Sequence, residues 1–222
     1  MKQKMQVEVW SDIMCPFCYI GKRNYETALA QFGDKDNVEI IWKSFQLNPD
    51  IPKEGEPGAG EHGNVYQYVA DMKGMSYEQS VKMHETVVQT AKRAGLEYHF
   101  DKAKITNSFK AHRLIQKAKS LGLGDAAEER LFYANFTEGL DYGTDAVLYQ
   151  LGEEIGLTKE QVTEALTDDE YALAVSDDIR EARQIGVNGV PFFVFDRKYA
   201  ISGAQPPELF LQTLEKAFGE EH

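Results

Sequence analysis

The stretch that decides the fold lies near the start of the chain: Val7-Glu8-Val9-Trp10-Ser11-Asp12-Ile13-Met14-Cys15-Pro16-Phe17-Cys18. Its first part is apolar and β-branched, which predicts a strand, and polar residues then end that strand. The pattern Cys-Pro-Phe-Cys begins a helix, because proline suits the first helical turn, where its missing N–H would be unpaired anyway. Two thiols separated by two residues at a helix start are placed to form a reversible disulfide. The free N–H groups and the dipole of that helix end favour a thiolate over a thiol.

The chain contains two cysteines, and both lie in this stretch. A structural zinc site needs four ligands, and the sequence offers neither a second cysteine pair nor a His-x-x-x-His partner. We therefore expect no metal and no required organic cofactor. Thiol chemistry is favoured over a metal half-site or two incidental cysteines. In a reducing cytoplasm, such a pair is more plausibly catalytic or redox-sensing than structural.

Length and composition are those of an ordinary globular protein with room for a sizeable core. The chain has 222 residues, of which 42% are hydrophobic and 27% charged. Its net charge of -12 argues against nucleic acid as a partner. No run approaches the ~18 apolar residues that a membrane span needs, and no apolar signal region precedes the first strand. We therefore expect no membrane partner and a cytoplasmic location.

The chain in order predicts two α/β segments around a helical block. Tyr19–Phe32 reads as an amphipathic helix and Val38–Leu47 as a second strand, which gives a βαβ unit at residues 1–50. Residues 51–166 begin within a Pro/Gly-rich loop, Asn48–Gly63, and form a helical insertion. Residues 167–222 give a helix, a β-hairpin and a final helix, or αββα. In that final helix Leu209, Phe210, Leu214 and Phe218 are expected to face inwards. The predicted class is thus α/β, interrupted by an all-helical insertion domain.

This outline resembles a thioredoxin fold with a DsbA-like helical insertion, and more closely the FrnE-type branch of the DsbA family. Four stretches carry the resemblance: Ser11-Asp12-x-x-Cys15-Pro16-x-Cys18-Tyr19-Ile20-Gly21, Asn107-x-x-x-Ala111-His112-Arg113-Leu114, Gly186-Val187-x-Gly189-Val190-Pro191-Phe192-Phe193-Val194 and Ile201-Ser202-Gly203-Ala204-Gln205. They run nearly from end to end, and their order and spacing are far more specific than the cysteine pair alone.

The resemblance implies a role for each residue around the pair. Cys15, nearer the helix start and expected to be more exposed, would be the nucleophile, and Cys18 the resolving thiol. Pro191 matches the family's cis-proline, which would present the backbone of Val190 to an extended substrate segment. Pro16 and Phe17, between the two cysteines, would complete the substrate-binding residues. Many relatives carry Trp where Phe17 stands, and the two central residues influence the redox potential.

Four further residues are candidates with competing interpretations. Asp12 is either a proton relay or a turn residue between strand and helix. Glu8 lies near the position of the buried acid of thioredoxin-like proteins, one residue out of register, and is a candidate proton acceptor for Cys18. Ser11 and His112 are candidate groove residues, although a helix histidine is more often structural.

The function this predicts is enzymatic, a protein thiol–disulfide oxidoreductase acting on thiols and disulfides of proteins or small molecules. Glutathione is a candidate redox partner or substrate. One alternative is a glutathione-binding enzyme of the kappa-class transferase or 2-hydroxychromene-2-carboxylate isomerase type. These typically use a serine near the first helix start, a position that Ser11 could fill. A second alternative is a non-enzymatic binding or chaperone-like protein. The direction of the reaction and the oligomeric state are not encoded in any pattern here.

Overall fold

The computed structural model describes residues 4–220. It divides the chain into two compact units, Met1–Leu47 with Ser176–His222, and Asn48–Val175. The boundaries expected at 50/51 and 166/167 fall at 47/48 and 175/176, the latter within a continuous helix, α8 (Asp169–Gln184). The predicted α/β class is confirmed, since a β-sheet unit is interrupted in the sequence by a helical one.

The first unit is built on a four-stranded mixed sheet. Its strands are β1 (Met5–Ser11), β2 (Val38–Ser44), β3 (Phe192–Phe195) and β4 (Tyr199–Ser202), in the order β2-β1-β3-β4. β1 pairs parallel to β2, with Ser11 opposite Ser44, and antiparallel to β3, which pairs antiparallel to β4. The predicted βαβ unit and C-terminal hairpin therefore join in one sheet, with β1 at its centre.

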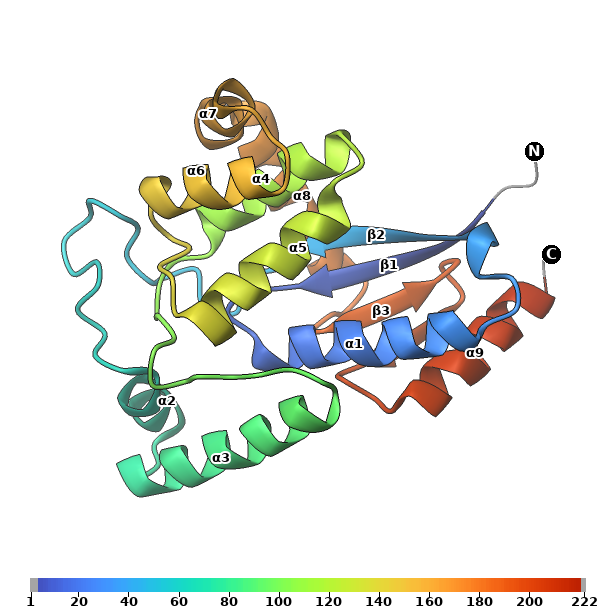
Figure 1. Cartoon of the computed structure of the whole chain (residues 1–222), viewed down its shortest axis with the longest axis horizontal. Coiled ribbons are helices and arrows are strands. Elements are labelled where there is room, and N and C mark those ends of the chain that lie inside the picture. Colours follow the sequence, from blue (N-terminus) through green and yellow to red (C-terminus); the bar gives the residue numbers. More distant parts are fainter. Residues whose placement is uncertain (1–3, 221–222) are drawn as a thin grey trace. The chain divides into compact units, whose positions relative to one another are not determined.

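Two helices, α1 (Pro16–Gln31) and α9 (Pro207–Gly219), lie side by side on one face of this sheet (Figure 1). The core there joins alternate residues of the strands to both helices: Met5, Val7, Val9, Tyr25, Ala28, Phe32, Trp42, Phe193, Phe195, Ile201, Phe210, Leu214 and Ala217. The expectation for Leu209 was wrong, since it is 41% exposed. Phe210, Leu214 and Ala217 already form the i, i+4, i+7 stripe, and the adjacent position points about 100° away from it.

The opposite face of the sheet carries Trp10 and Val194, which pack with Ala182 of α8 and with Val187. The indole Nε1–H of Trp10 donates a 3.0 Å hydrogen bond to the backbone oxygen of Asp178, also on α8. Odd-numbered residues of β1 thus face α1, and even-numbered ones face the C-terminal part of α8, because strand side chains alternate.

The second unit, Asn48–Val175, is a set of helices joined by loops. They are α2 (Val65–Lys73), α3 (Tyr77–Arg93), α4 (Phe109–Ser120), α5 (Gly124–Tyr133), the π-helical turn η2 (Ala134–Glu138), α6 (Asp145–Glu154), α7 (Lys159–Thr167) and the start of α8. The insertion is therefore helical, as predicted. No helix within residues 4–220 combines the length and apolarity that crossing a bilayer requires.

The Asn107–Leu114 motif acts inside this second unit. The Asn107 side-chain amide donates to the backbone oxygens of Pro49 and Ile51, at 3.2 and 2.6 Å, and so ties down the start of the long loop. The Arg113 guanidinium donates to the backbone oxygens of Ala165 and Asp168, both at 2.8 Å, which satisfies carbonyls at the C-terminal end of α7. These contacts give the motif a structural explanation.

Candidate active site

The two cysteines begin α1 immediately after β1. Cys15 is the N-cap residue with an extended backbone, and Pro16 occupies the first turn, as the sequence predicted. The Cys15 N–H donates to the Asp12 backbone oxygen at 2.9 Å, and the Cys18 N–H to the Cys15 oxygen at 3.1 Å. Both cysteines are free thiols in this structure. The arrangement places two sulfur atoms at a helix N-terminus, where negative charge is stabilised.

The two thiols have different surroundings. The Cys15 Sγ donates a 3.3 Å hydrogen bond to the backbone oxygen of Val190. Burial raises the pKa of Cys18 well above its usual value, and the neighbouring Cys15 raises it further by hydrogen bonding and, when ionised, by its negative charge. Cys18 therefore keeps its proton. Exposure distinguishes the thiols little, since Cys15 is 4% and Cys18 1% exposed, so the greater exposure expected for Cys15 is slight.

Ser11 and Asp12 lie beneath the cysteine pair, and both are fully buried. The Ser11 hydroxyl and the Asp12 backbone N–H hydrogen-bond to Cys18 and lower its pKa, although less than burial raises it. The Asp12 carboxylate accepts from the backbone N–H groups of Met14, at 3.3 Å, and Leu47, at 2.7 Å. These contacts favour the turn-forming interpretation of Asp12, since its carboxylate joins the β1–α1 loop to the segment after β2.

The Val190–Pro191 peptide bond, which is cis, forms the other wall of the site. The Pro191 backbone oxygen accepts a 2.8 Å hydrogen bond from the N–H of Gly203. Gly203 has a φ of +81°, a conformation that L side chains rarely adopt. On α1, a Cβ added to Gly21 would lie 2.9 Å from Cγ of Pro191. Glycine at position 21 therefore permits the close approach of the helix to the proline.

Phe17 is the exposed member of the Cys-Pro-Phe-Cys stretch. Its side chain is 44% exposed, whereas Pro16 is half-buried and both cysteines are buried. An exposed ring beside two thiols is suited to contact an apolar group of a substrate. Val190 is half-buried and Pro191 buried, and the backbone oxygen of Val190 already contacts the Cys15 sulfur. The four predicted substrate-binding residues thus gather around Cys15, and their role stays a prediction.

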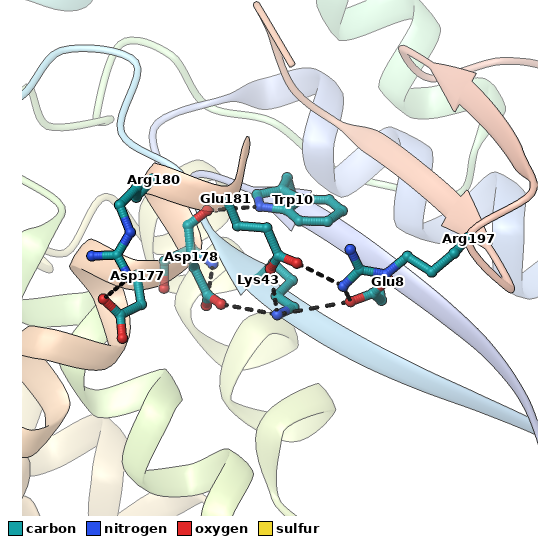
Figure 2. A network of polar contacts seen from close by, with 9 residues as sticks. Glu8, Trp10, Lys43, Asp177, Asp178, Arg180, Glu181 and Arg197 are labelled. Carbon is teal, nitrogen blue, oxygen red and sulfur yellow. Dashed lines mark hydrogen bonds and ion pairs between the residues drawn. The ribbon is translucent and has the colours of Figure 1, made fainter. Parts of the chain in front are cut away.

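Glu8 faces away from the cysteines, in a network of charges on the α8 side of the sheet (Figure 2). Its carboxylate pairs with Arg197 and lies 3.7 Å from the Lys43 Nζ. Lys43 also contacts Asp178 at 3.2 Å and Glu181 at 2.9 Å. Because β1 side chains alternate, Glu8 and the α1-facing residues point to opposite faces of the sheet. We therefore do not carry the proton-relay interpretation of Glu8 forward.

His112 lies in the second unit, where it is fully buried in α4. Its backbone N–H donates to the Ser108 oxygen at 2.9 Å, in the first turn of the helix. Complete burial is what a structural helix histidine shows, and a groove role for His112 stays a prediction. Within residues 4–220, no group of three or more His, Cys, Asp and Glu side chains is arranged to hold a metal ion.

Three supporting residues escaped the sequence analysis, although each stands in or beside a quoted motif. Gly21 and Gly203 adapt the backbone around Pro191. The side-chain amide of Asn24, on α1, donates a 2.9 Å hydrogen bond to the Gln205 backbone oxygen just after β4. The Ile201–Gln205 motif therefore fastens the Pro191 loop and α1 together. Its glycine was the available signal, because a glycine after a strand often marks a positive φ.

Comparison with known proteins decides the family. The model of the DSBA-like thioredoxin domain matches residues 6–215. The chain belongs to this family. The probable DsbA oxidoreductase SCO1869 of Streptomyces coelicolor shares 39% identity and a TM-score of 0.89, covering 98% of this chain and 92% of that one. The Bacillus subtilis protein YwbO is 26% identical over 98% of this chain and 97% of its own.

A solved structure of lower sequence identity shares the fold of this family member. It is the cytosolic disulfide reductase DsbM of Pseudomonas aeruginosa, at 19% identity and a TM-score of 0.67, covering 97% of this chain and 99% of that one. The predicted thioredoxin-like fold with its helical insertion, and the resemblance to the DsbA family, are thus confirmed. Membership supports thiol oxidoreductase chemistry, while the particular reaction is a matter for proposal.

Proposed function

We propose that this DsbA-family protein is a thiol–disulfide oxidoreductase that works through Cys15 and Cys18. The observation that carries the proposal is the asymmetry of the pair. Cys15 caps the helix and lies against the Val190 backbone, whereas Cys18 is buried and holds its proton. This favours Cys15 as the thiol that meets the substrate and Cys18 as the one that resolves the mixed disulfide.

The chemistry is a pair of exchanges. The Cys15 thiolate attacks a substrate disulfide, forming a mixed disulfide and releasing one substrate thiolate, which takes up a proton. Cys18 then displaces the second substrate sulfur and closes the Cys15–Cys18 bond. The substrate gains two electrons and two protons, and the cysteine pair loses them; the reverse sequence oxidises a substrate dithiol. No metal or organic cofactor is needed, and glutathione, protein thiols and small disulfides are the proposed partners.

The test separates the two cysteines by trapping. The protein is equilibrated in glutathione buffers, quenched with a thiol-alkylating reagent, and resolved by mass. We expect the wild type to form the Cys15–Cys18 disulfide and Cys18→Ser to accumulate a mixed disulfide with glutathione. Cys15→Ser is the matched control and should accumulate little mixed disulfide with glutathione. Trapping on Cys15→Ser instead would reverse the roles, and a wild type that forms no internal disulfide in any buffer would refute the proposal.

The same titration gives the direction of the reaction. A reduction potential of about -120 mV would make the protein an oxidant that introduces disulfides. A potential of about -270 mV would make it a reductant suited to the cytosol. Biological activity that survives replacement of both cysteines would select the alternative of a non-enzymatic binding or chaperone-like protein. Glutathione binding without disulfide turnover would select the transferase or isomerase type. The cytoplasmic location stays a prediction.

A further inference from the structure

The resolving thiol lies in a polar corner formed by the end of β1. Ser11 ends the row of residues that faces α1, after Met5, Val7 and Val9. This row is otherwise apolar, and Ser11 is fully buried. Its hydroxyl and the Asp12 backbone N–H both donate hydrogen bonds to the Cys18 sulfur. Two donors thus converge on a sulfur atom that is 1% exposed.

The backbone holds this corner in place on both sides. The Ser11 backbone oxygen accepts a 2.9 Å hydrogen bond from the Phe45 N–H, which joins β1 to the end of β2. The Asp12 carboxylate accepts from Leu47 at 2.7 Å, and the Asp12 backbone oxygen accepts from Cys15 at 2.9 Å. The donors are therefore fixed before any charge develops on Cys18, which is the condition under which such groups assist a reaction most.

We propose that the Ser11 hydroxyl is a catalytic hydrogen-bond donor that stabilises the Cys18 thiolate during the resolving step. The inference rests on the proposed function. In that step Cys18 gives its proton to solvent and its electron pair attacks the Cys15 sulfur. The Cys15–Cys18 bond forms, the bond between Cys15 and the substrate sulfur breaks, and the substrate leaves as a thiolate that takes up a proton.

A neutral hydrogen-bond donor suits this position because burial is what hinders the ionisation of Cys18. A buried thiol resists ionisation, since its charged form loses the stabilisation of water. A hydroxyl compensates by donating to the thiolate without adding a second negative charge.

The test is the reaction of the reduced protein with 5,5′-dithiobis(2-nitrobenzoate), followed by stopped-flow from pH 5 to pH 10. Cys15 attack releases the first coloured thiolate, and Cys18 resolution releases the second. For Ser11→Ala we expect the first phase unchanged and the second phase slower at every pH below the raised pKa of Cys18. One hydrogen bond to a charged group corresponds to about a tenfold change in thiolate. Higher nucleophilicity of the more basic thiolate offsets part of this, which leaves the second phase about threefold slower at low pH.

The controls separate a hydroxyl effect from a loosened structure. Ser44→Ala removes a buried hydroxyl at the position opposite Ser11 on β2 and should leave the rate of the second phase unchanged. Ser11→Thr keeps a hydroxyl and should restore the wild-type profile. Ser11→Gly is the second variant without a hydroxyl, in case Ser11→Ala does not fold.

An unchanged rate of the second phase in Ser11→Ala, or an equal slowing in Ser44→Ala, overturns the inference alone. A wild type with a single phase and no internal disulfide overturns the proposed function as well. The two failures are therefore distinguishable.

Discussion

Replacing Lys43 by methionine tests whether the charge network behind the sheet stabilises the first unit. Lys43 is the cation that reaches three carboxylates: its Nζ lies 2.9 Å from Glu181, 3.2 Å from Asp178 and 3.7 Å from Glu8 (Figure 2). Burial lowers the pKa of Lys43, but hydrogen bonds and attraction from Glu181 and Asp178 outweigh it, so that the pKa is raised overall. Methionine keeps an unbranched apolar side chain and removes the ammonium group, whose nitrogen lies 5.8 Å from the centre of the Trp10 ring.

The expected cost follows from what remains after the substitution. Each contact is worth about 5 kcal/mol of gross attraction at an effective dielectric constant near 20. The loss of solvation opposes most of this, and removing one member of a buried ion pair typically costs about 3–5 kcal/mol. Arg197 still pairs with Glu8 and Glu181, and the Ser44 N–H still donates to Asp178. We therefore expect a lower value, about 2–3 kcal/mol.

Thermal unfolding followed by circular dichroism measures this loss. For a chain of this size, about 2–3 kcal/mol corresponds to a fall in Tm of about 5–10 °C at pH 7. Lys35→Met is the matched control, because it removes the same charge from an exposed position just before β2, and should change stability by less than about 0.5 kcal/mol. Equal Tm values for the two variants would refute the reasoning.

The acid side of the pH profile gives a second check on the same variant. Burial raises the pKa of Glu181, but Lys43 and Arg197 outweigh it and lower the pKa overall. Such a group contributes stability above its unfolded pKa of about 4.3, and that stability disappears as pH falls through the lower folded value. The wild type and Lys43→Met should therefore converge in stability below about pH 4. A gap that stays constant down to pH 3 would show that packing, and not charge, is what the substitution removes.

Two further predictions concern the contacts around Pro191 and the long loop. Gly21→Ala places a methyl 2.9 Å from Cγ of Pro191, so we expect the free energy of unfolding to fall by about 1–3 kcal/mol and disulfide exchange to become slower. Gly33→Ala is the control, because a methyl there meets open space and should change neither quantity. Equal behaviour of the two variants in unfolding and exchange assays would contradict this. The Lys110 hydrogen bond lowers the pKa of Glu54, so Glu54→Gln should cost about 0.5–1 kcal/mol at pH 7 and nothing below about pH 3. A urea titration at both pH values checks this, and a loss that persists at pH 3 would contradict it.

The order of the elements could be predicted from the sequence because each carries a local signal. Capping boxes begin α3 at Ser76 and α7 at Thr158, and the sequence shows both as a Ser or Thr followed three residues later by Gln. The π-helical turn η2 that directly follows α5 could not be predicted, since turn length depends on tertiary packing that periodicity does not report. The unit boundary at 175/176 was missed for a similar reason, because α8 has a continuous helical pattern across it.

Some features of the candidate site can be predicted from adjacent residues, whereas others depend on residues far apart in the sequence. The cysteine pair and Pro16 are read from adjacent residues, and the structure places them at the helix start as expected. The contacts of Gly21 with Pro191 and of Asn24 with Gln205 join residues about 170–180 positions apart. No pattern in a single sequence reports which distant residue a glycine approaches, so these supports could only come from the structure.

Strand alternation explains why Glu8 faces away from Cys18. Positions 5, 7, 9 and 11 face α1, and positions 8 and 10 face the other side. Any β1 side chain that reaches Cys18 must therefore come from the odd positions, and of these Ser11 alone is polar. Because no carboxyl stands in that row, the proton of Cys18 has no acceptor on β1. The thiolate must then be stabilised by donors, and the Ser11 hydroxyl and the Asp12 N–H are the two that the fold supplies there.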